Sequence, residues 1–157
     1  FMLFYTCGIR RNELQELTWD KIDLTQKQVL VYGKGKKERY VPLIPKMIDI
    51  LTTYKKIMVD FELDATQFVF LNNNGQKLYP NFIYRTIKKY LQMVTTQQGI
   101  GPHTLRHSFA THLLNNGAEL NAIKEMLGHA SLAATQVYTH NSIDKLKRIH
   151  ELSHPKS

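Results

Sequence analysis

The sequence predicts an α+β fold that is predominantly helical and contains one small antiparallel β-hairpin. Three observations lead to this prediction. Apolar residues recur at helical spacing along most of the chain, β-branched residues gather at 29–32, and a second such stretch follows a turn rich in glycine and lysine. The 157 residues suffice for one domain with its own core, and no internal repeat divides them.

The first half of the chain predicts one helix followed by the hairpin. Residues 1–17 have the pattern of a helix with Leu14 and Leu17 on one side, and residues 19–24 form a turn. Strands are expected at 29–32 and 39–43. Between them, Gly33 and Gly35 permit tight turning, and the adjacent lysines cannot be buried. The segment 33–38 is therefore expected to be a basic hairpin tip.

The second half predicts helices that begin at prolines, because proline is favoured in the first helical turn. Pro45 starts one helix, residues 68–70 are a candidate short strand, and 72–75 form a turn. Pro80 starts another helix. Its expected buried stripe consists of Ile83, Ile87, Tyr90, Leu91 and Val94.

The last predicted helices and the segments that join them carry most of the candidate catalytic residues. Pro102 starts a helix that extends to residue 114, and residues 118–127 form a helix that ends at Gly128 in the left-handed conformation. Ser131 is expected to cap a helix that carries Tyr138, and residues 141–157 should form a short amphipathic tail helix.

Charge points to an anionic partner. Lysine and arginine number 21 against 13 aspartate and glutamate, which gives a net charge of +8. From Ala65 to Ala118 the chain has no acidic residue, although several basic residues lie there. A surface of that kind attracts a phosphate backbone.

Cysteine content and the beginning of the chain narrow the class of protein. Cys7 is the only cysteine, which excludes an internal disulfide and a thiolate zinc cluster and is compatible with a reducing cytosol. The apolar opening, residues 1–9, is far shorter than the roughly 20 residues of a membrane span. It lacks an initiating Met and a helix cap, so we expect residues 1–157 to be the C-terminal part of a longer protein whose upstream domain is absent.

A set of cationic or imidazole residues and one phenol suits chemistry on a phosphodiester, where fixed donors must meet the negative charge of the transition state. The candidate catalytic residues are Arg10, Lys34, His103, Arg106, His129 and Tyr138. At about 100° per residue, His103 and Arg106 share one side of their helix near its positive N-terminal end. Taken alone, an H-x-x-R string is more often a pair of solvent-exposed side chains without a function. Tyr138, taken alone, would be interpreted as an aromatic residue of the core.

A second group of basic residues consists of candidate DNA contacts. On the Pro80 helix these residues form a polar stripe beside the buried one, which an ordinary solvated helix face would explain equally well. Three more lie at or beside the hairpin tip. The predicted DNA contacts are Lys36, Lys37, Arg39, Arg85, Lys88 and Lys89.

Five short strings come in an order typical of one family. They are Gly8-Ile9-Arg10-Arg11-Asn12-Glu13-Leu14, Gly33-Lys34-Gly35, His103-Thr104-Leu105-Arg106-His107, Leu127-Gly128-His129 and Tyr138-Thr139-His140. In these strings and their spacing, nearly the whole chain resembles the catalytic domain of the tyrosine recombinases, the phage integrase family. The resemblance implies the tyrosine recombinase catalytic fold.

The resemblance also implies roles. Arg10 is then the first catalytic arginine, with Glu13 placed for a same-face ion pair. Tyr138 attacks a DNA phosphorus to form a 3′-phosphotyrosyl ester, and Lys34 protonates the departing 5′ oxygen. His103, Arg106 and His129 fill the remaining positions, and no metal or cofactor is needed.

The implied partners are double-stranded DNA recombination sites and further copies of the chain, as a tetramer on synapsed DNA, with the 141–157 tail docking on a neighbouring protomer. A membrane or a small-molecule substrate is not expected. The expected location is the bacterial cytoplasm at the nucleoid, and the expected role is recombination of a mobile genetic element.

The sequence fits some other classes of DNA-acting or hydrolytic protein less well and leaves two of them open. A zinc hydrolase using His103 and His107 lacks a third ligand and a general-base glutamate, and Asp20 with Asp23 is too small a carboxylate group for a two-metal nuclease. A noncatalytic module remains open, because residues 121–138 resemble a helix-turn-helix. A type IB topoisomerase, which shares the ester chemistry, also remains open.

Overall fold

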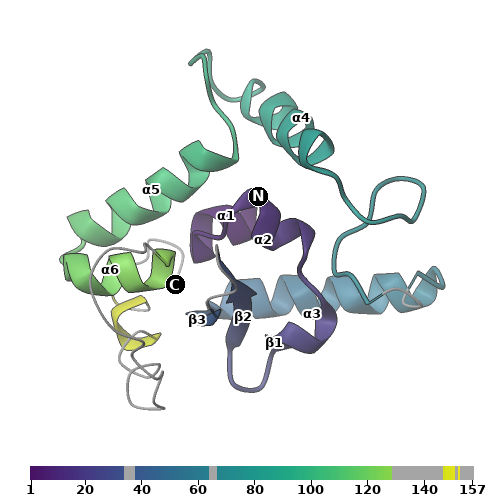
Figure 1. Cartoon of the computed structure of the whole chain (residues 1–157), viewed down its shortest axis with the longest axis horizontal. Helices are drawn as coiled ribbons and strands as arrows, with labels where there is room; N and C mark the ends of the chain where they lie inside the picture. Colours follow the sequence, from purple (N-terminus) through teal and green to yellow (C-terminus); the bar gives the residue numbers. More distant parts are fainter. Residues whose placement is uncertain (34–37, 64–66, 129–146, 151, 153–157) are drawn as a thin grey trace.

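The computed structural model describes residues 1–33, 38–63, 67–128, 147–150 and 152 (Figure 1). Helices predominate in this part of the chain, beside one small sheet, which confirms the predicted fold class. The elements in chain order are α1 (Met2–Cys7), α2 (Arg11–Gln15), the 3₁₀ helix η1 (Trp19–Lys21), β1 (Ile22–Asp23), β2 (Gln28–Tyr32), β3 (Glu38–Pro42), α3 (Pro45–Asp60), α4 (Pro80–Leu91), α5 (Pro102–Asn115) and α6 (Leu120–Leu127).

Helices α1 and α2 lie at the centre of the molecule (Figure 1). Helix α1 contacts α3 on one side and α5 on the other, and α2 contacts α4. Helix α6 contacts both α5 and β3, so it closes the arrangement next to the sheet. The two short central helices are thus in contact with most of the elements that carry predicted functional residues.

The single helix predicted over residues 1–17 is wrong, because the chain breaks at Gly8. Gly8 has φ of 58° and ends α1 in the left-handed conformation. A Cβ at this position would lie 2.5 Å from Cδ1 of Phe109 and 2.9 Å from Cδ2 of Leu127, so only glycine fits. The break lets α2 begin anew at Arg11, with Arg10 just outside its first turn.

The predicted hairpin is confirmed and has an additional strand. β2 and β3 are antiparallel, with Val29 opposite Val41 and Val31 opposite Arg39. The two-residue strand β1, within a segment predicted as a turn, pairs with the other edge of β2. Val29, Val31 and Val41 are all buried, so the face that they share with Arg39 is the inner face of the sheet.

The segment between α3 and α4 pairs less regularly than predicted. Residues 68–70 form no strand; instead, isolated bridges join Thr18 to Phe68 and Leu71 to Lys77. The turn at 72–75 is confirmed by the hydrogen bond from Gly75 N to Asn72 O at 3.0 Å. The Asn72 side chain accepts hydrogen bonds from two following backbone amides, a standard way for asparagine to hold a turn.

The helices that begin at Pro45, Pro80 and Pro102 are confirmed. In α4, Ile83 and Ile87 are buried as predicted, but Tyr90 and Val94 are 51% and 80% exposed. Val94 lies beyond the end of α4 at Leu91, and Tyr90, in the last turn of the helix, contacts the ring of Phe1 at the surface instead of entering the core. Gly128 terminates α6 in the left-handed conformation, with φ of 61° and ψ of 48°, as predicted.

Two hydrophobic clusters form the core. One joins α1, the sheet, α3 and α4, and the other joins α5 and α6 through Phe109, Leu113 and Met126. No helix in the described part of the chain is long and apolar enough to cross a membrane.

The described part of the tail is helical at residues 147–150 and packs on its own chain. Ile149 contacts the α5–α6 cluster. His150 is fully buried, its Nε2 donates a hydrogen bond to Thr6 O at 2.6 Å, and its ring lies beside Phe109. The predicted docking of the 141–157 tail on a neighbouring protomer stays a prediction, and residues 141–146 lie outside the described residues.

Candidate active site: a guanidinium cluster at the end of α6

Arg10 joins the first turn of α2 to the end of α6. Its backbone N donates to Glu13 Oε2 at 2.7 Å, and its Nη1 donates to Glu13 Oε1 at 2.9 Å. The predicted ion pair between Arg10 and Glu13 is therefore confirmed. Nη2 of Arg10 donates to Gly128 O at 2.8 Å. The side chain remains 32% exposed, so this guanidinium is held in place and also open to solvent.

Arg106 lies deeper, on the face of α5 that meets α1 and α6. It is 8% exposed. Nη1 donates to Gly8 O, and Nη2 donates to Leu127 O at 2.6 Å. One guanidinium thus binds the carbonyl ends of two helices, α1 and α6. Because backbone carbonyls carry the negative end of the helix dipole, both contacts favour a cation.

Arg39 corrects one sequence prediction. It was predicted to contact DNA, but it is 2% exposed and its donors are committed inside the protein. Nη1 and Nη2 donate to the two Glu13 oxygens at 2.7 and 2.8 Å, and Nε donates to Met126 O at 2.7 Å. A DNA phosphate cannot reach such a side chain. The physical reason is the strand register, which places Arg39 on the inner face of the sheet beside Val41.

Together, these three arginines and Glu13 form what we call the guanidinium cluster. Arg39, Arg106 and Arg10 donate to the carbonyls of Met126, Leu127 and Gly128 respectively, which are three consecutive residues at the end of α6. Sequence reasoning had found Arg10, Arg106 and the Glu13 pair, but it missed this shared target because backbone carbonyls leave no mark in a sequence. The next residue along the chain is His129.

Burial and the charges of the cluster shift the pKa values of Glu13 and Arg106. Burial pushes the pKa of Glu13 upward, but hydrogen bonds and charge from Arg39, followed by hydrogen bonds from Arg10, outweigh it and hold the pKa below its usual value. Burial, with the charges of Arg10 and Arg39, lowers the pKa of Arg106 to about 10. The cluster sets three guanidinium groups against one carboxylate, which leaves it with excess positive charge.

The other predicted catalytic residues are placed only in part. His103 is exposed on the first turn of α5, one turn before Arg106, as the spacing predicted. Residues 34 and 129–146 lie outside the described residues, so the predicted roles of Lys34, His129 and Tyr138 stay predictions. The same applies to Lys36 and Lys37.

The basic stripe of α4, which consists of Arg85, Lys88 and Lys89, faces solvent. Arg85 and Lys89 are exposed and Lys88 is partly buried. Nη2 of Arg85 is 3.2 Å from the Tyr79 hydroxyl, and Nζ of Lys89 lies 5.9 Å from the Tyr90 ring centroid. No acidic side chain pairs with these three residues among the contacts described, so their charge is available to an external anion.

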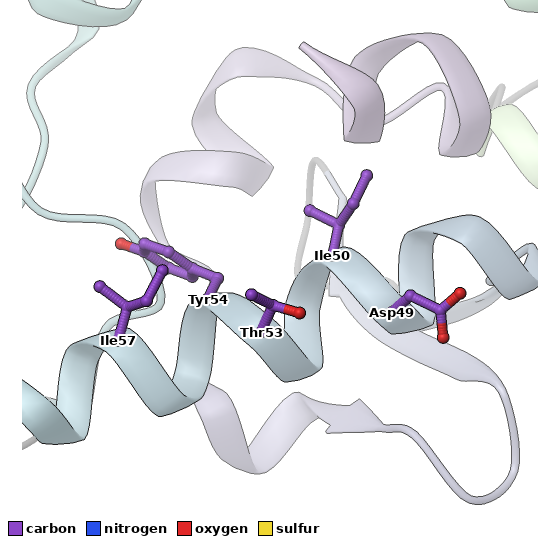
Figure 2. A pocket seen from close by; sticks show the side chains of 5 residues that line it. All are labelled: Asp49, Ile50, Thr53, Tyr54 and Ile57. Carbon is purple, nitrogen blue, oxygen red and sulfur yellow. The ribbon is translucent and has the colours of Figure 1, made fainter.

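A depression on α3 is a separate surface feature. Figure 2 shows its lining side chains along one side of the helix: Asp49, Ile50, Thr53, Tyr54 and Ile57. None of the predicted catalytic or DNA-contact residues is among them. In the described part of the chain, no three His, Cys, Asp or Glu side chains gather as metal ligands would.

Comparison with known proteins places this arrangement in a family. Residues 1–145 match the phage integrase family. Tyrosine recombinase XerC of Thermodesulfovibrio yellowstonii is 44% identical over 161 residues, covering 99% of this chain and 53% of that protein. The chain spans about half the length of the curated relatives it matches.

Solved structures agree. The crystal structure of XerA recombinase has a TM-score of 0.75 at 31% identity, covering 94% of this chain and 55% of that one. The XerH site-specific recombinase bound to difH substrate in a pre-cleavage complex has a TM-score of 0.71 at 30% identity, covering 93% and 43% respectively. The predicted resemblance is confirmed over nearly the full length: the chain belongs to the phage integrase family of tyrosine recombinases.

Proposed function

We propose that this chain is the catalytic part of a site-specific DNA recombinase that cuts and rejoins strands through a 3′-phosphotyrosyl ester. The observation that carries the proposal is the guanidinium cluster, in which Arg10 and Arg106 are fixed on adjacent carbonyls directly before His129. Membership of the tyrosine recombinase family supports it.

Arg10 and Arg106 have the chemistry needed to bind a phosphate in its transition state. A guanidinium has five N–H donors, and the described contacts use two Nη donors of each residue. The remaining donors are held in fixed planes and suit the nonbridging oxygens of a phosphodiester. Since their partners are already in place, little reorganisation accompanies the reaction, which is the condition for strong electrostatic catalysis.

The remaining steps use residues outside this cluster. Tyr138 attacks phosphorus, and Lys34 donates a proton to the departing 5′ oxygen. An ordinary phenol has a pKa of about 10, so it requires a nearby acceptor, for which we propose His103. His129 adds a hydrogen bond to the phosphoryl group. The bond from phosphorus to the 5′ oxygen breaks as the bond to the Tyr138 oxygen forms. Because the new ester retains the bond energy of the phosphodiester, a free 5′ hydroxyl of another strand can attack it, release the tyrosine and so reverse the step.

Contacts to the rest of the duplex come from exposed cations. We propose that Arg85, Lys88 and Lys89 on α4, together with Lys36 and Lys37, bind the DNA backbone. Exposure of the α4 stripe without acidic partners supports this assignment. The assembly is a tetramer on two synapsed DNA sites, in the bacterial cytoplasm at the nucleoid. The mobile-element setting favoured by the sequence stays a prediction.

Trapping the ester tests the proposal. The complete protein is incubated with a labelled duplex that carries a nick next to the cleavage site, so that the cut strand end diffuses away and the reaction cannot reverse. We expect label to remain with the polypeptide on a denaturing gel, and we expect none with Tyr138→Phe, although that variant binds the same DNA. Joined products without any covalent complex would contradict the proposal.

Strand exchange separates this proposal from a type IB topoisomerase. A recombinase joins strands from two different duplexes, whereas a topoisomerase only relaxes its own. A helix-turn-helix module would show neither activity and would bind DNA independently of the Tyr138 hydroxyl.

A further inference from the structure

Arg39 is an unusual residue for the inner face of a sheet. Its neighbours on that face are valines, and only 2% of its surface is exposed. Burying a guanidinium is costly unless it is paired with an opposite charge and its nitrogens are hydrogen-bonded. Arg39 meets that condition, because Nε, Nη1 and Nη2 each have an acceptor at 2.7 or 2.8 Å.

The acceptors of Arg39 belong to two different parts of the site. The Glu13 carboxylate is one, and the same carboxylate holds the backbone and side chain of Arg10. Met126 O at the end of α6 is the other. Arg39 therefore connects the element that presents Arg10 to the helix that leads into residues 129–138.

Gly128 fits closely against Arg39. A Cβ on Gly128 would lie 3.1 Å from Nη1, 3.2 Å from Cδ and 3.3 Å from Cζ of Arg39. The flat guanidinium is thus a surface on which the left-handed end of α6 rests. Its position sets where Gly128 O, the acceptor for Arg10, can lie.

We propose that Arg39 is a positioning residue for strand cleavage. It acts through Glu13 on the orientation of Arg10, and through Met126 and Gly128 on the carbonyls at the end of α6 that Arg10 and Arg106 bind. It does not touch DNA. This inference rests on the proposed function, since it concerns the rate of the same cleavage step.

The geometry requires a guanidinium and not merely a positive charge. Three donors in one plane serve two carboxylate oxygens and one carbonyl together. A lysine ammonium in the same place cannot reach all three acceptors with that fixed geometry. The conservative change Arg39→Lys should therefore damage positioning while keeping the charge.

The experiment measures cleavage and binding separately in the complete protein. Single-turnover cleavage of the nicked duplex, DNA affinity and the melting temperature are compared for wild type and Arg39→Lys. We expect cleavage to slow about 10–100-fold, the range seen when a group that orients an active-site residue is removed. DNA affinity should stay within about threefold, because Arg39 lies out of reach of the DNA.

A matched control separates positioning from general loss of stability. Leu51 is fully buried in α3 and has no polar side-chain atom that could bond to the guanidinium cluster, so Leu51→Ala destabilises the domain without removing any hydrogen bond or ion pair of that cluster. At a temperature below both melting transitions, Leu51→Ala should cleave at the wild-type rate. Equal loss of cleavage in the two variants at equal melting temperature would overturn the proposal.

A second variant covers the case in which Arg39→Lys does not fold. Glu13→Gln combined with Arg39→Met removes both partners of the buried Arg39–Glu13 ion pair, so neither of these two charges is left buried without the other, and this double variant should fold. We expect it to bind DNA and cleave slowly. Wild-type cleavage by either Arg39 variant, or a loss of affinity that parallels the loss of rate, overturns the role of Arg39. If wild type itself forms no covalent complex, the proposed function fails first, which distinguishes the two failures.

Discussion

The guanidinium cluster and the basic stripe of α4 carry positive charge in opposite ways. In the cluster, Arg39 is 2% exposed and Arg106 is 8% exposed, and donors of both are bonded to Glu13 or to carbonyls at the ends of α1 and α6. On α4, Arg85 and Lys89 are exposed, with only weak aromatic or hydroxyl contacts. A count of charges treats the two regions alike. The structure indicates that the cluster holds its donors in fixed positions, whereas the α4 stripe offers solvated charge that attracts an anion.

This difference leads to different expectations for mutants. A fixed donor acts on one phosphate, and its loss should appear in the rate of cleavage. A solvated cation acts on the DNA as a polymer, and its loss should appear in affinity and in salt dependence. A cluster variant that changed only affinity and salt dependence, or an α4 variant that changed only the cleavage rate, would contradict this distinction.

The largest effect is expected for Arg106→Lys. Lysine keeps the charge but cannot bind Gly8 O and Leu127 O and still present paired donors to a phosphate. Single-turnover cleavage should fall about 10²–10³-fold, the range for loss of one transition-state donor. Arg85→Lys, the same change on the exposed stripe, is the matched control and should cleave normally. If Arg106→Lys cleaved within about threefold of the wild-type rate, the buried cluster would not differ from the exposed α4 stripe in its effect on cleavage, and the prediction would be wrong.

The second effect concerns stability and pH. Glu13→Gln leaves Arg39 buried without its charge partner, which should lower the free energy of unfolding by about 3 kcal/mol. The folded-state pKa of Glu13 lies below its ordinary value of 4.5, so the unfolded chain binds more protons between the two values. Wild type should therefore lose this contribution as the pH falls through that window, whereas Glu13→Gln should not.

Urea unfolding between neutral and acidic pH measures both parts of this prediction. Glu16→Gln is the control, because Glu16 is exposed and pairs with Lys77 at the surface. It should change stability by less than about 1 kcal/mol. An equal pH dependence in Glu13→Gln and wild type would show that the carboxylate contributes nothing through its ionisation.

The third effect tests the packing beneath Arg106. Gly8 and Gly117 both have positive φ, but a Cβ on Gly8 meets Phe109 and Leu127, whereas a Cβ on Gly117 meets nothing within 4 Å. Gly117→Ala should cost about 1 kcal/mol for the left-handed backbone alone. Gly8→Ala adds overpacking and should cost about 2–3 kcal/mol. Thermal melting of the two variants checks the difference, and equal losses would contradict the close approach at Gly8.

The sequence predicted the helices and the hairpin because apolar spacing and first-turn prolines are local signals. It failed at Gly8, since a left-handed glycine inside an apolar run looks like helix interior until Phe109 is seen against it. Arg39 was grouped with the hairpin lysines, although its alternation with Val41 indicates the inner face of a strand. Its partner Glu13 lies 26 residues earlier, and such a pairing follows from the fold alone.

The candidate site was predictable in a similar measure. The side that His103 and Arg106 share follows from helical spacing. The Arg10–Glu13 pair was predicted from the same rule, but Arg10 is the extended residue before α2, and Glu13 reaches back to it across the first turn. The convergence of Arg39 and Arg106 with Arg10 on consecutive carbonyls could not be predicted, because it depends on how α5, α2 and β3 meet the end of α6.

The smallest effect on cleavage is expected on α4. Removing Arg85, Lys88 and Lys89 together, each to Gln, should lower the slope of log affinity against log salt by about 2.7, because each lost phosphate contact releases about 0.9 fewer counterions. At saturating DNA, the cleavage rate should stay within about twofold of wild type. The control removes Lys46, Lys55 and Lys56 of α3 in the same way. These lysines are also exposed, but their helix carries Asp49 and Asp60.

Both triple variants lose the same charge, so net charge alone predicts equal effects on binding. If the α4 stripe binds the DNA backbone as proposed, the loss should be confined to the α4 variant, because α4 carries no acidic residue whereas α3 carries Asp49 and Asp60. DNA affinity measured at several salt concentrations decides between these outcomes. An equal change of slope in both variants would show that the α4 stripe contributes only to the overall field of the protein. The two regions would then differ in how deeply their cations are buried, but not in their separate effects on cleavage and on DNA binding.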